Sequence, residues 1–481
     1  MNRRMILYMV GQVCEITAVL MVLPLIVSIL YRERCLIDFL LAITVALVIG
    51  LALTFLSRPT SKVIYAKEGY IIVGLSWIVV SAIGALPFYF SQQIPHYIDA
   101  FFETVSGFTT TGASILTDVE AMSKGLLFWR SFTHWIGGMG VLVFLMAVVP
   151  LQNDRGMHIA RAEMPGPTVG KLMPRLRDTA RVLYLIYAGM SVIMVIFELA
   201  GGMPFFDSLL HMFGAAGTGG FGIKSDSIAS YSPYEQWVIT IFMLLFGVNF
   251  NLYYLCLHKH FKEVLESDEL KTYLALFLIS SALITINTLS QNVSVATAIR
   301  NACFQVSSIM TTTGYATTDF NKWPEFSKGI LMFLMLIGAC AGSTGGGLKV
   351  SRLVMLAKNV KRELRHLIHP RSVGVVRFEG RTVDDQTLHS VSVYLALYMG
   401  ILIAVALLLS LDRFDFETNL SAANACFNNI GPGLGAVGPA SNYAGYSPFS
   451  KLVLCAAMLL GRLEIYPLFL MMTPSIWSRS N

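Results

Sequence analysis

Long runs of apolar residues, separated by short polar segments, extend over almost the whole chain. A helix needs about 20 mostly apolar residues to cross the roughly 30 Å hydrocarbon core of a bilayer, so each such run predicts a membrane-spanning helix. Two runs lead the chain, Met5–Leu30 and Ile37–Leu56, and another covers Leu452–Met472. The pattern therefore predicts an all-α polytopic membrane protein with roughly ten crossings.

Beyond the second run, the pattern of apolar and polar positions repeats four times. Each copy contains a long apolar span, a half-length apolar segment, a loop rich in glycine, and a second span. The long spans are expected at Tyr70–Phe90, Val182–Leu199, Tyr273–Leu289 and Val391–Leu411, and the half-length segments at Tyr97–Ser106, Phe205–Phe213, Thr297–Ser308 and Leu420–Asn429. We therefore divide the chain into two leading transmembrane helices at 1–66 and four repeats at 67–155, 156–262, 263–370 and 371–481.

The half-length segments are too short to cross a bilayer, which predicts short helices that enter the membrane and turn back. Irregular backbone survives at membrane depth only where protein or a water-filled cavity satisfies its polar groups. We therefore expect the four loops to meet around one shared aqueous axis. The loops are Ser106–Gly112, Phe213–Gly219, Ser308–Gly314 and Phe427–Gly433, and a glycine recurs in each following span, at Gly138, Gly247, Gly338 and Gly461.

The residues of these loops suit the binding of a desolvated cation. Backbone carbonyl oxygens can replace the hydration shell of an ion when the chain is extended and the carbonyls point one way. Glycine reaches the necessary positive φ at little steric cost, and the loops end on Gly112, Gly219, Gly314 and Gly433. The preceding residues offer hydroxyl acceptors in three loops and a proline carbonyl in the fourth, at Thr111, Thr218, Thr313 and Pro432. A single Thr-Gly pair is ordinary in loops, but four copies at matching positions favour a filter.

Composition and charge agree with membrane insertion. Of the 481 residues, 55% are hydrophobic and 13% are charged, and the mean hydropathy is +0.64. The formal net charge of +6 comes from basic clusters between spans, which indicates cytoplasmic loops rather than a nucleic-acid surface. These clusters are Arg58, Lys62 and Lys67; Arg155, Arg161, Lys171, Arg175, Arg177 and Arg181; and Lys349, Arg352, Lys358, Lys361, Arg362, Arg365 and Arg371.

The same charge rule places the N-terminus, with Arg3 and Arg4, in the cytoplasm, although Arg32 and Arg34 between the two leading runs oppose this topology. The seven cysteines form no Cys-x-x-Cys pair. We therefore expect neither a disulfide framework nor a zinc site.

The second span of the third repeat is interrupted between Gly338 and Lys349 by a segment that contains five glycines. Each glycine costs about 1 kcal/mol in a helix, so this segment is expected to unwind. Close packing of two helices on small residues is the alternative. A phosphate-binding loop is not supported, because the motif Gly-x-x-x-x-Gly-Lys-Ser/Thr is absent.

One basic residue, Arg462, follows Gly461 inside an apolar run. A cation at the bilayer centre costs at least about 2.5–3.5 kcal/mol, so such a residue is normally paired or lines an aqueous path. Glu464 is two residues away and lies on a different face of a helix, which makes it a poor local partner. A structural salt bridge elsewhere, or a side chain that extends to the membrane interface, remains the alternative to a pore-lining role.

These loops and spans resemble the Trk/Ktr/HKT superfamily of K+ transporters, and the chain as a whole resembles its TrkH-type membrane subunit. The resemblance implies four repeats of span, pore helix, filter and span around a central pore, with two extra leading helices. In the plant members of that superfamily a serine at the first filter position accompanies a preference for Na+, so Gly112 at this position implies a preference for K+. The implied filter residues are Thr110, Thr111 and Gly112; Gly217, Thr218 and Gly219; Thr312, Thr313 and Gly314; and Gly431, Pro432 and Gly433.

The resemblance also implies how the path is controlled. Arg462 would be an electrostatic barrier in the pore. A homodimer in the lipid of a bacterial cytoplasmic membrane is implied, with a cytosolic nucleotide-binding ring of TrkA-type regulatory subunits; K+ is the expected ligand, without an organic cofactor in this chain. A flexible gate below the filter would be formed by Gly338, Gly342, Ser343, Thr344, Gly345, Gly346, Gly347 and Lys349.

A secondary transporter of another cation or small solute is the alternative function, because such transporters also use broken helices near the membrane midplane. They typically contain two inverted repeats, whereas four copies in one orientation favour a central pore. The spans contain no grouping of Cys, His and Asp at metal-ligand or nucleophile–base spacing, so an enzyme is not expected. The residues leave open whether K+ flows passively or is coupled to H+ or Na+.

Overall fold

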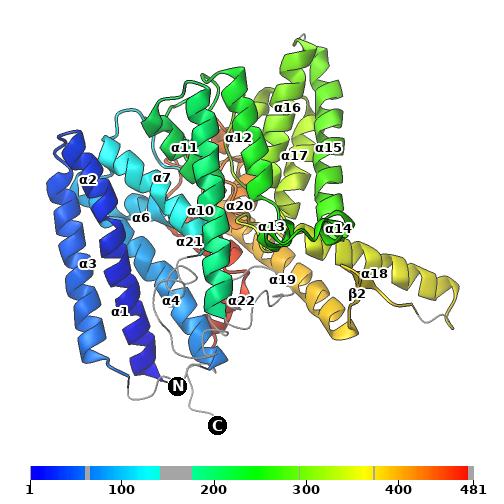
Figure 1. The fold of residues 1–481 in the computed structure, drawn as a ribbon, viewed down its shortest axis with the longest axis horizontal. Coiled ribbons are helices and arrows are strands. Elements are labelled where there is room, and N and C mark those ends of the chain that lie inside the picture. The colour runs from blue at the N-terminus through cyan, green and yellow to red at the C-terminus, as the bar shows by residue number, and fades with distance from the viewer. Residues whose placement is uncertain (1, 60–64, 141–175, 292, 372–373, 475–481) are drawn as a thin grey trace.

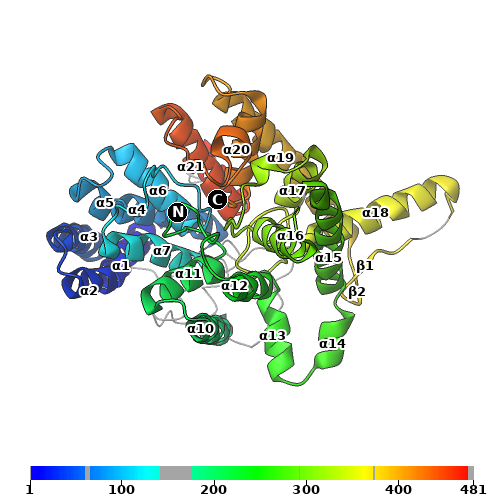
Figure 2. The same ribbon diagram turned by 90° about the horizontal axis from the view of Figure 1, so that it is seen from above.

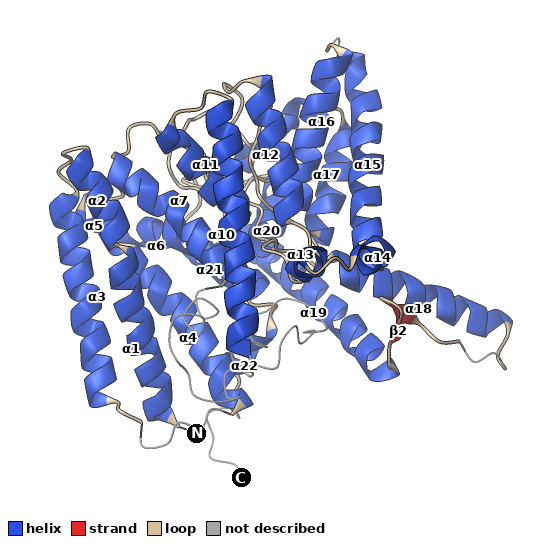
Figure 3. Cartoon of the chain, in the orientation of Figure 1, coloured by secondary structure: helices blue, strands red, loops and turns tan. Residues whose placement is uncertain are grey.

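The computed structural model describes residues 2–59, 65–140, 176–291, 293–371 and 374–474. Within these ranges the ordered elements are helices, apart from one two-stranded hairpin (Figure 3). Six of the described helices are long and apolar enough to cross a membrane. The expected all-α polytopic membrane fold is therefore confirmed. Lys62, the basic residues from Arg155 to Arg175 and the repeat boundary expected at residues 155–156 lie outside the described residues.

Two leading helices pack side by side at the edge of the molecule (Figure 1). They are α1 (Arg3–Leu20), continued by α2 (Val22–Leu30), and α3 (Leu36–Leu56). Glycines allow the close approach, because a Cβ on Gly50 would lie 3.0 Å from the carbonyl oxygen of Gly11 and 2.8 Å from Cγ of Glu15. Thr54 of α3 donates a 2.8 Å hydrogen bond to the Glu15 carboxylate, which satisfies this ionisable group between the two helices.

Each repeat supplies a long first helix, a short pore helix and a second helix. The first repeat contains α4 (Ala66–Gly84), α5 (Leu86–Phe90), α6 (Tyr97–Phe108) and α7 (Lys124–Gly138), and the second contains α10 (Leu176–Ala200), α11 (Phe205–Gly217), α12 (Pro233–Phe246), α13 (Phe250–Leu257) and α14 (Phe261–Glu266). The third contains α15 (Asp268–Thr288), η2 (Leu289–Gln291), α16 (Val295–Met310), η3 (Phe320–Lys322), α17 (Glu325–Ile337) and α18 (Val350–Ile368). The fourth contains β1 (Arg377–Phe378), β2 (Arg381–Thr382), α19 (Asp385–Leu409), α20 (Phe416–Phe427), η4 (Gly435–Val437), α21 (Pro448–Arg462) and α22 (Tyr466–Met472).

The strands β1 and β2 pair antiparallel, with Arg377 opposite Thr382 and Phe378 opposite Arg381. This hairpin lies beside α18, which extends away from the body of the molecule (Figure 1). The pore helices α6, α11, α16 and α20 alternate with the second helices α7, α12, α17 and α21, and each packs against the next until α21 returns to α6. The view from above shows this closed ring of helices, with the long first helices outside it (Figure 2).

All four second helices end at or beside the glycine that repeats in the sequence. The helices that end there contain 15, 14, 13 and 15 residues, in the order α7, α12, α17 and α21. Each is shorter than the roughly 20 residues of a full crossing. The bend between α12 and α13 reaches 91°. The sequence indicated an interruption in the third repeat, and the structure shows that the second helices of the other repeats also end at or beside their glycine. Among the described residues, six helices are long enough for a full crossing, or seven if the bent pair α12 and α13 counts as one span.

Close backbone contact explains why the breaks fall on glycine. A Cβ on Gly138 would lie 2.7 Å from Cα of Gly217 in the neighbouring repeat, and a Cβ on Gly461 would collide with the carbonyl oxygen of Phe427. These are pore-helix residues just before the filter loops. Only glycine lets the second helices approach the loops so closely.

We predict that Gly50→Leu destabilises the leading helix pair, because the added side chain would overlap Gly11 and Glu15. Overpacking of this kind typically costs about 1–3 kcal/mol, so the apparent melting temperature of the purified protein in detergent should fall. Gly400→Leu in α19 is the matched control, because a Cβ there meets nothing within 4 Å. Equal melting temperatures for the two variants would contradict the packing argument.

Candidate functional site

The four pore helices end in the same backbone conformation. Just beyond each helix, one residue has a left-handed φ, with values of 56°, 54°, 60° and 56°, and we call this residue the cap. In every loop the next amide donates a 2.8 Å hydrogen bond to the carbonyl five residues earlier, which completes a Schellman motif. The capping residues are Thr110, Thr218, Thr312 and Asn429. Four non-glycine residues in this uncommon conformation identify structurally equivalent positions.

A glycine with positive φ follows two residues after each cap. These are Gly112, Gly220, Gly314 and Gly431, with φ values of 79°, 71°, 89° and 92°. The equivalent segments are therefore Thr110–Gly112, Thr218–Gly220, Thr312–Gly314 and Asn429–Gly431.

This alignment differs from the expected filter in two repeats. The expected residues of the first and third loops fall on the equivalent segments, but Gly217 in the second repeat still belongs to α11, and the segment extends one residue further, to Gly220. In the fourth loop the segment ends at Gly431, two residues earlier than expected. Pro432 then follows it, and the amide of Gly433 bonds to the carbonyl of Val437 instead of continuing the segment.

The glycines of these segments pack against one another in cyclic order. A Cβ on Gly112 would collide with the carbonyl oxygen of Gly219, one on Gly220 with that of Thr313, and one on Gly314 with that of Ile430. A Cβ on Gly431 would lie 2.7 Å from the carbonyl oxygen of Thr111, which closes the ring. The four loops therefore meet around one axis, and in each contact a glycine faces a backbone carbonyl oxygen of the next loop.

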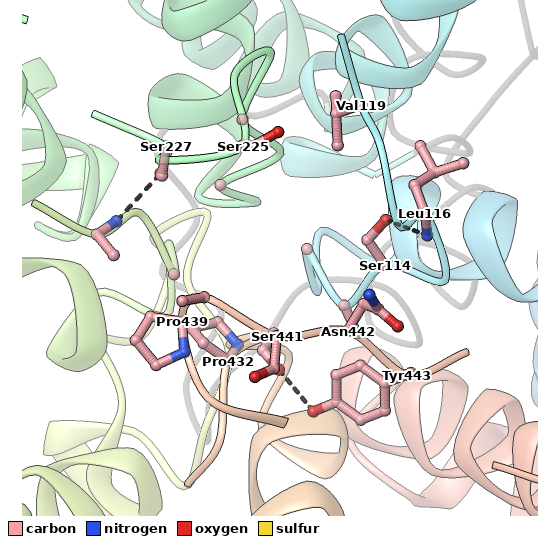
Figure 4. A pocket seen from close by; sticks show the side chains of 18 of the residues that line it. Ser114, Leu116, Val119, Ser225, Ser227, Pro432, Pro439, Ser441, Asn442 and Tyr443 are labelled. Carbon is pink, nitrogen blue, oxygen red and sulfur yellow. Dashed lines mark hydrogen bonds between the residues drawn. The ribbon is translucent and has the colours of Figure 1, made fainter. Parts of the chain in front are cut away.

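A cavity opens onto this ring, and its walls include all four positive-φ glycines (Figure 4). Ser114, Lys224, Asn442 and Tyr443 are among the other residues that line it. The ring is therefore accessible from the side on which the chain leaves the loops.

Side chains behind the ring brace the first and third loops. The hydroxyls of Thr109 and Thr111 lie 2.8 Å apart, and those of Thr311 and Thr313 are separated by the same distance. Nδ2 of Asn429 donates to Oγ1 of Thr111 at 3.0 Å, which joins the fourth loop to the first. These threonine hydroxyls therefore hold the loops together.

A buried ion pair links the first two repeats. Nε of Arg130 lies 2.6 Å from Oε1 of Glu103, and both side chains are buried. The same carboxylate accepts hydrogen bonds from the hydroxyl of Ser114 and the amide of Ile115, just beyond the first filter segment. Nη1 of Arg130 donates to the carbonyl of Gly222 at 2.9 Å, beyond the second segment. This pair was not predicted from the sequence, although two ionisable residues of opposite charge within one repeat were a signal for it.

The interrupted segment of the third repeat unwinds, as expected. Gly338, Gly342, Gly347 and Lys349 all have positive φ. The amide of Gly346 donates to Oγ1 of Thr312 at 2.7 Å, so the segment lies directly against the filter loop of its own repeat. We call residues 338–349 the intramembrane loop.

Other bonds tie this loop to the second repeat and to itself. Oγ1 of Thr344 donates to the carbonyl of Phe246, and the amide of Cys340 donates to the carbonyl of Gly247. The ammonium of Lys349 bonds to the carbonyl of Gly345 within the loop, and the Ser343 hydroxyl bonds to the carbonyl of Cys340. The expected gate residues are therefore brought together below the filter segments.

Arg462 is the last residue of α21, and its guanidinium bridges two repeats. Nη1 donates to the carbonyl of Thr344 at 2.7 Å, and Nη2 donates to the carbonyls of Gly137 and Gly138 at 2.6 and 2.7 Å. A cation beside the carbonyls at the end of α7 is electrostatically favourable. Glu464 pairs with Arg352 of α18, which agrees with its assignment as a poor partner for Arg462.

A buried carboxylate at the start of α15 holds both ends of the intramembrane loop. Oε1 of Glu269 accepts hydrogen bonds from the amide of Ala341 at 2.7 Å and from the amide of Ser351 at 3.0 Å. Ala341 lies near the beginning of the loop, and Ser351 is the second residue of α18. Sequence spacing gave no indication of this contact, because the carboxylate is about 70 to 80 residues away from both amides.

Comparisons with known proteins agree with this architecture. The family model described as TrkH, cation transport protein, matches residues 36–286 and 272–479. The chain is 36% identical to the Trk system potassium uptake protein TrkH of Salmonella typhimurium, across 99% of this chain and 100% of the relative. It is 33% identical to the Trk system potassium uptake protein TrkG of Escherichia coli, across 98% of each.

Among solved structures, the crystal structure of the potassium transporter TrkH from Vibrio parahaemolyticus is similar, with a TM-score of 0.89 and 31% identity across 99% of this chain and 100% of that one. The family is one of transporters and not of enzymes, and the resemblance noted from the loop motifs is confirmed. The chain therefore belongs to the TrkH family of cation transport proteins.

Proposed function

We propose that this protein takes up K+ across the cytoplasmic membrane of a bacterium, through a filter lined by the carbonyl oxygens of four loops. The observation that carries the proposal is the closed ring in which each positive-φ glycine packs against a carbonyl of the next loop. The filter segments are 110–112, 218–220, 312–314 and 429–431. In this proposal the register seen in the backbone replaces the one expected for the second and fourth loops.

The chemistry of this ring suits a large, weakly hydrated cation. Carbonyl dipoles replace the hydration shell of such an ion, and glycines at the contacts between the loops let these carbonyls come close together. The names of the relatives, which are potassium uptake proteins, support K+ as the ion. K+ is then the transported ion, and no step requires an organic cofactor.

The intramembrane loop and Arg462 are proposed as the gate and the barrier below the filter. The intramembrane loop is bonded to Thr312 of the third filter loop, and Arg462 is bonded to the intramembrane loop through Thr344. A guanidinium on the path repels a passing cation, and a loop bonded to Thr312 obstructs the exit. Opening would require the bonds of Glu269, Thr312 and Arg462 to this loop to rearrange together.

Assembly and regulation follow from the same family relationship. A homodimer in the membrane, with the N-terminus in the cytoplasm, and a cytosolic nucleotide-binding ring of the TrkA type are proposed as the working complex. The helix α18 begins where the intramembrane loop ends and extends away from the body, which supports a role in transmitting the regulatory signal (Figure 1). Its exposed side chains Leu364, Leu367 and Ile368 stand among basic residues and offer a contact surface.

We predict that Gly112→Ser lowers the ratio of K+ to Na+ uptake by about tenfold, because a side chain at φ +79° strains the filter and collides with the carbonyl of Gly219. The initial rates of 86Rb+ and 22Na+ uptake into proteoliposomes measure this ratio. Gly329→Ser in α17, where a Cβ meets nothing within 4 Å, is the control. An unchanged ratio in a variant that still transports would contradict the filter assignment.

We also predict that Arg462→Ala raises 86Rb+ flux by about tenfold, since removing a fixed charge from the path removes roughly 1–2 kcal/mol of barrier. Arg462→Lys should stay close to the original flux, because it retains the charge. Flux into proteoliposomes at equal protein content, with and without a proton gradient, measures both the barrier and any coupling. A fall in the alanine variant at equal folded protein would instead assign Arg462 a structural role.

A third variant tests the gate separately from the filter. Glu269→Ala removes the acceptor for the amides of Ala341 and Ser351, so the flux without a regulatory subunit should rise several-fold while the K+ to Na+ ratio stays constant. Glu263→Ala on α14 is the control, because that carboxylate is exposed. If the ratio falls and the flux does not rise, Glu269 supports the filter rather than the gate.

A further inference from the structure

The fourth filter loop lacks the pair of threonine hydroxyls found in the first and third loops, and Asn429 instead donates to Thr111 and to the carbonyl of Met458. At the positions of the paired threonines it carries Asn428 and Ile430, and the isoleucine side chain can form no hydrogen bond. Its glycine also approaches the next loop less closely, since a Cβ on Gly431 would stay 2.7 Å from the carbonyl oxygen of Thr111. At the other three contacts the Cβ would collide with the facing carbonyl oxygen. The bonds of Asn429 do not involve the carbonyl oxygen of Gly431 itself.

Tyr443, in the segment between η4 and α21, reaches this carbonyl. Its hydroxyl donates a 2.7 Å hydrogen bond to the oxygen of Gly431, and its amide donates a 2.8 Å bond to the carbonyl of Ser114. The first bond holds the fourth filter loop, and the second holds the chain just beyond the first filter loop. Tyr443 therefore spans the contact between the two loops, and its ring borders the cavity above the filter (Figure 4).

The ring of Tyr443 is held rigidly. Its side chain is buried, and its centroid lies 5.7 Å from that of Phe102 on the pore helix α6 and 6.1 Å from that of Tyr446. A rigid ring fixes the position of its hydroxyl, and the hydroxyl in turn fixes the carbonyl. Among the described residues, Gly431 is the filter glycine whose carbonyl receives a hydroxyl hydrogen bond.

We infer that Tyr443 is a positioning residue for ion selectivity, which holds the carbonyl of Gly431 in the filter through its hydroxyl. A carbonyl oxygen has two lone pairs, so it can accept this bond and still face an ion. The bond limits the movement of one of the four dipoles that surround the ion. Without it, that carbonyl is free to move inward around a smaller ion, which favours Na+ relative to K+. This inference rests on the proposed filter.

The test compares Tyr443→Phe with Tyr446→Phe in proteoliposomes. The first removes the hydroxyl that bonds to Gly431, and the second removes a neighbouring buried hydroxyl that bonds to Asn419 instead. We expect Tyr443→Phe to lower the 86Rb+ to 22Na+ uptake ratio about fivefold, as for the loss of one hydrogen bond. Tyr446→Phe should leave the ratio unchanged, and a loss of general stability would affect total flux in both variants rather than the ratio.

Gly112→Ser, measured in the same way, distinguishes a failure of the role inferred for Tyr443 from a failure of the filter assignment. If Gly112→Ser lowers the ratio and Tyr443→Phe does not, the role of Tyr443 is overturned and the filter stands. If neither changes the ratio, the filter assignment fails as well.

A fluorinated tyrosine at position 443 provides a second measurement should Tyr443→Phe fail to fold. Fluorine makes the hydroxyl a stronger donor while the ring keeps almost the same size. The ratio should therefore stay at the original value or rise. A ratio about fivefold below it would contradict the inference.

Discussion

The structure depends on direct contact between backbones at the centre of the helix ring. Four loops approach one another so closely that a side chain on Gly112, Gly220 or Gly314 would overlap a carbonyl oxygen of the next loop. Backbone at this depth in a membrane must still satisfy its polar groups. The Schellman bonds at the pore-helix ends do so, because each returns a loop amide to a carbonyl of its own helix. The breaks in the second helices follow from the same constraint, since their glycines let these helices press against the loops.

All four repeats belong to one chain, so they can share one backbone conformation while they carry different side chains. The caps accept threonine three times and asparagine once. The first repeat adds the buried pair of Glu103 and Arg130, which ties the segments after two filter loops together. The third repeat replaces a helix end with the intramembrane loop, and the fourth contributes Arg462 to the same region. In a ring made of four identical subunits, every subunit would carry the same side chains, so these features could not be confined to single repeats.

The sequence predicted the features that depend on local composition. Apolar runs located the leading helices, the long first helices and the pore helices, and glycine density located the intramembrane loop. It did not determine the backbone conformation where several registers satisfy the same composition. The second loop has glycines at 217, 219 and 220 and the fourth at 431 and 433, so counting glycines could not identify which one takes positive φ after the cap. The contact of Glu269 with the amide of Ala341, 72 residues away, and that of Arg130 with Gly222 in the second repeat are tertiary, and no spacing in the sequence encodes them.

The intramembrane loop is linked to the third loop of the ring and to α18 through a continuous set of bonds. The amide of Gly346 donates to Oγ1 of Thr312, and Glu269 accepts hydrogen bonds from the amides of Ala341 in the loop and Ser351 at the start of α18. The turn of the β1–β2 hairpin reaches the start of α15, where the carboxylate of Glu379 accepts a hydrogen bond from the amide of Glu269. A displacement of α18 or of the hairpin therefore acts on the residue that clamps the loop. Because Lys349 holds a strained positive φ where the loop meets α18, this junction is where a change of backbone conformation would release strain.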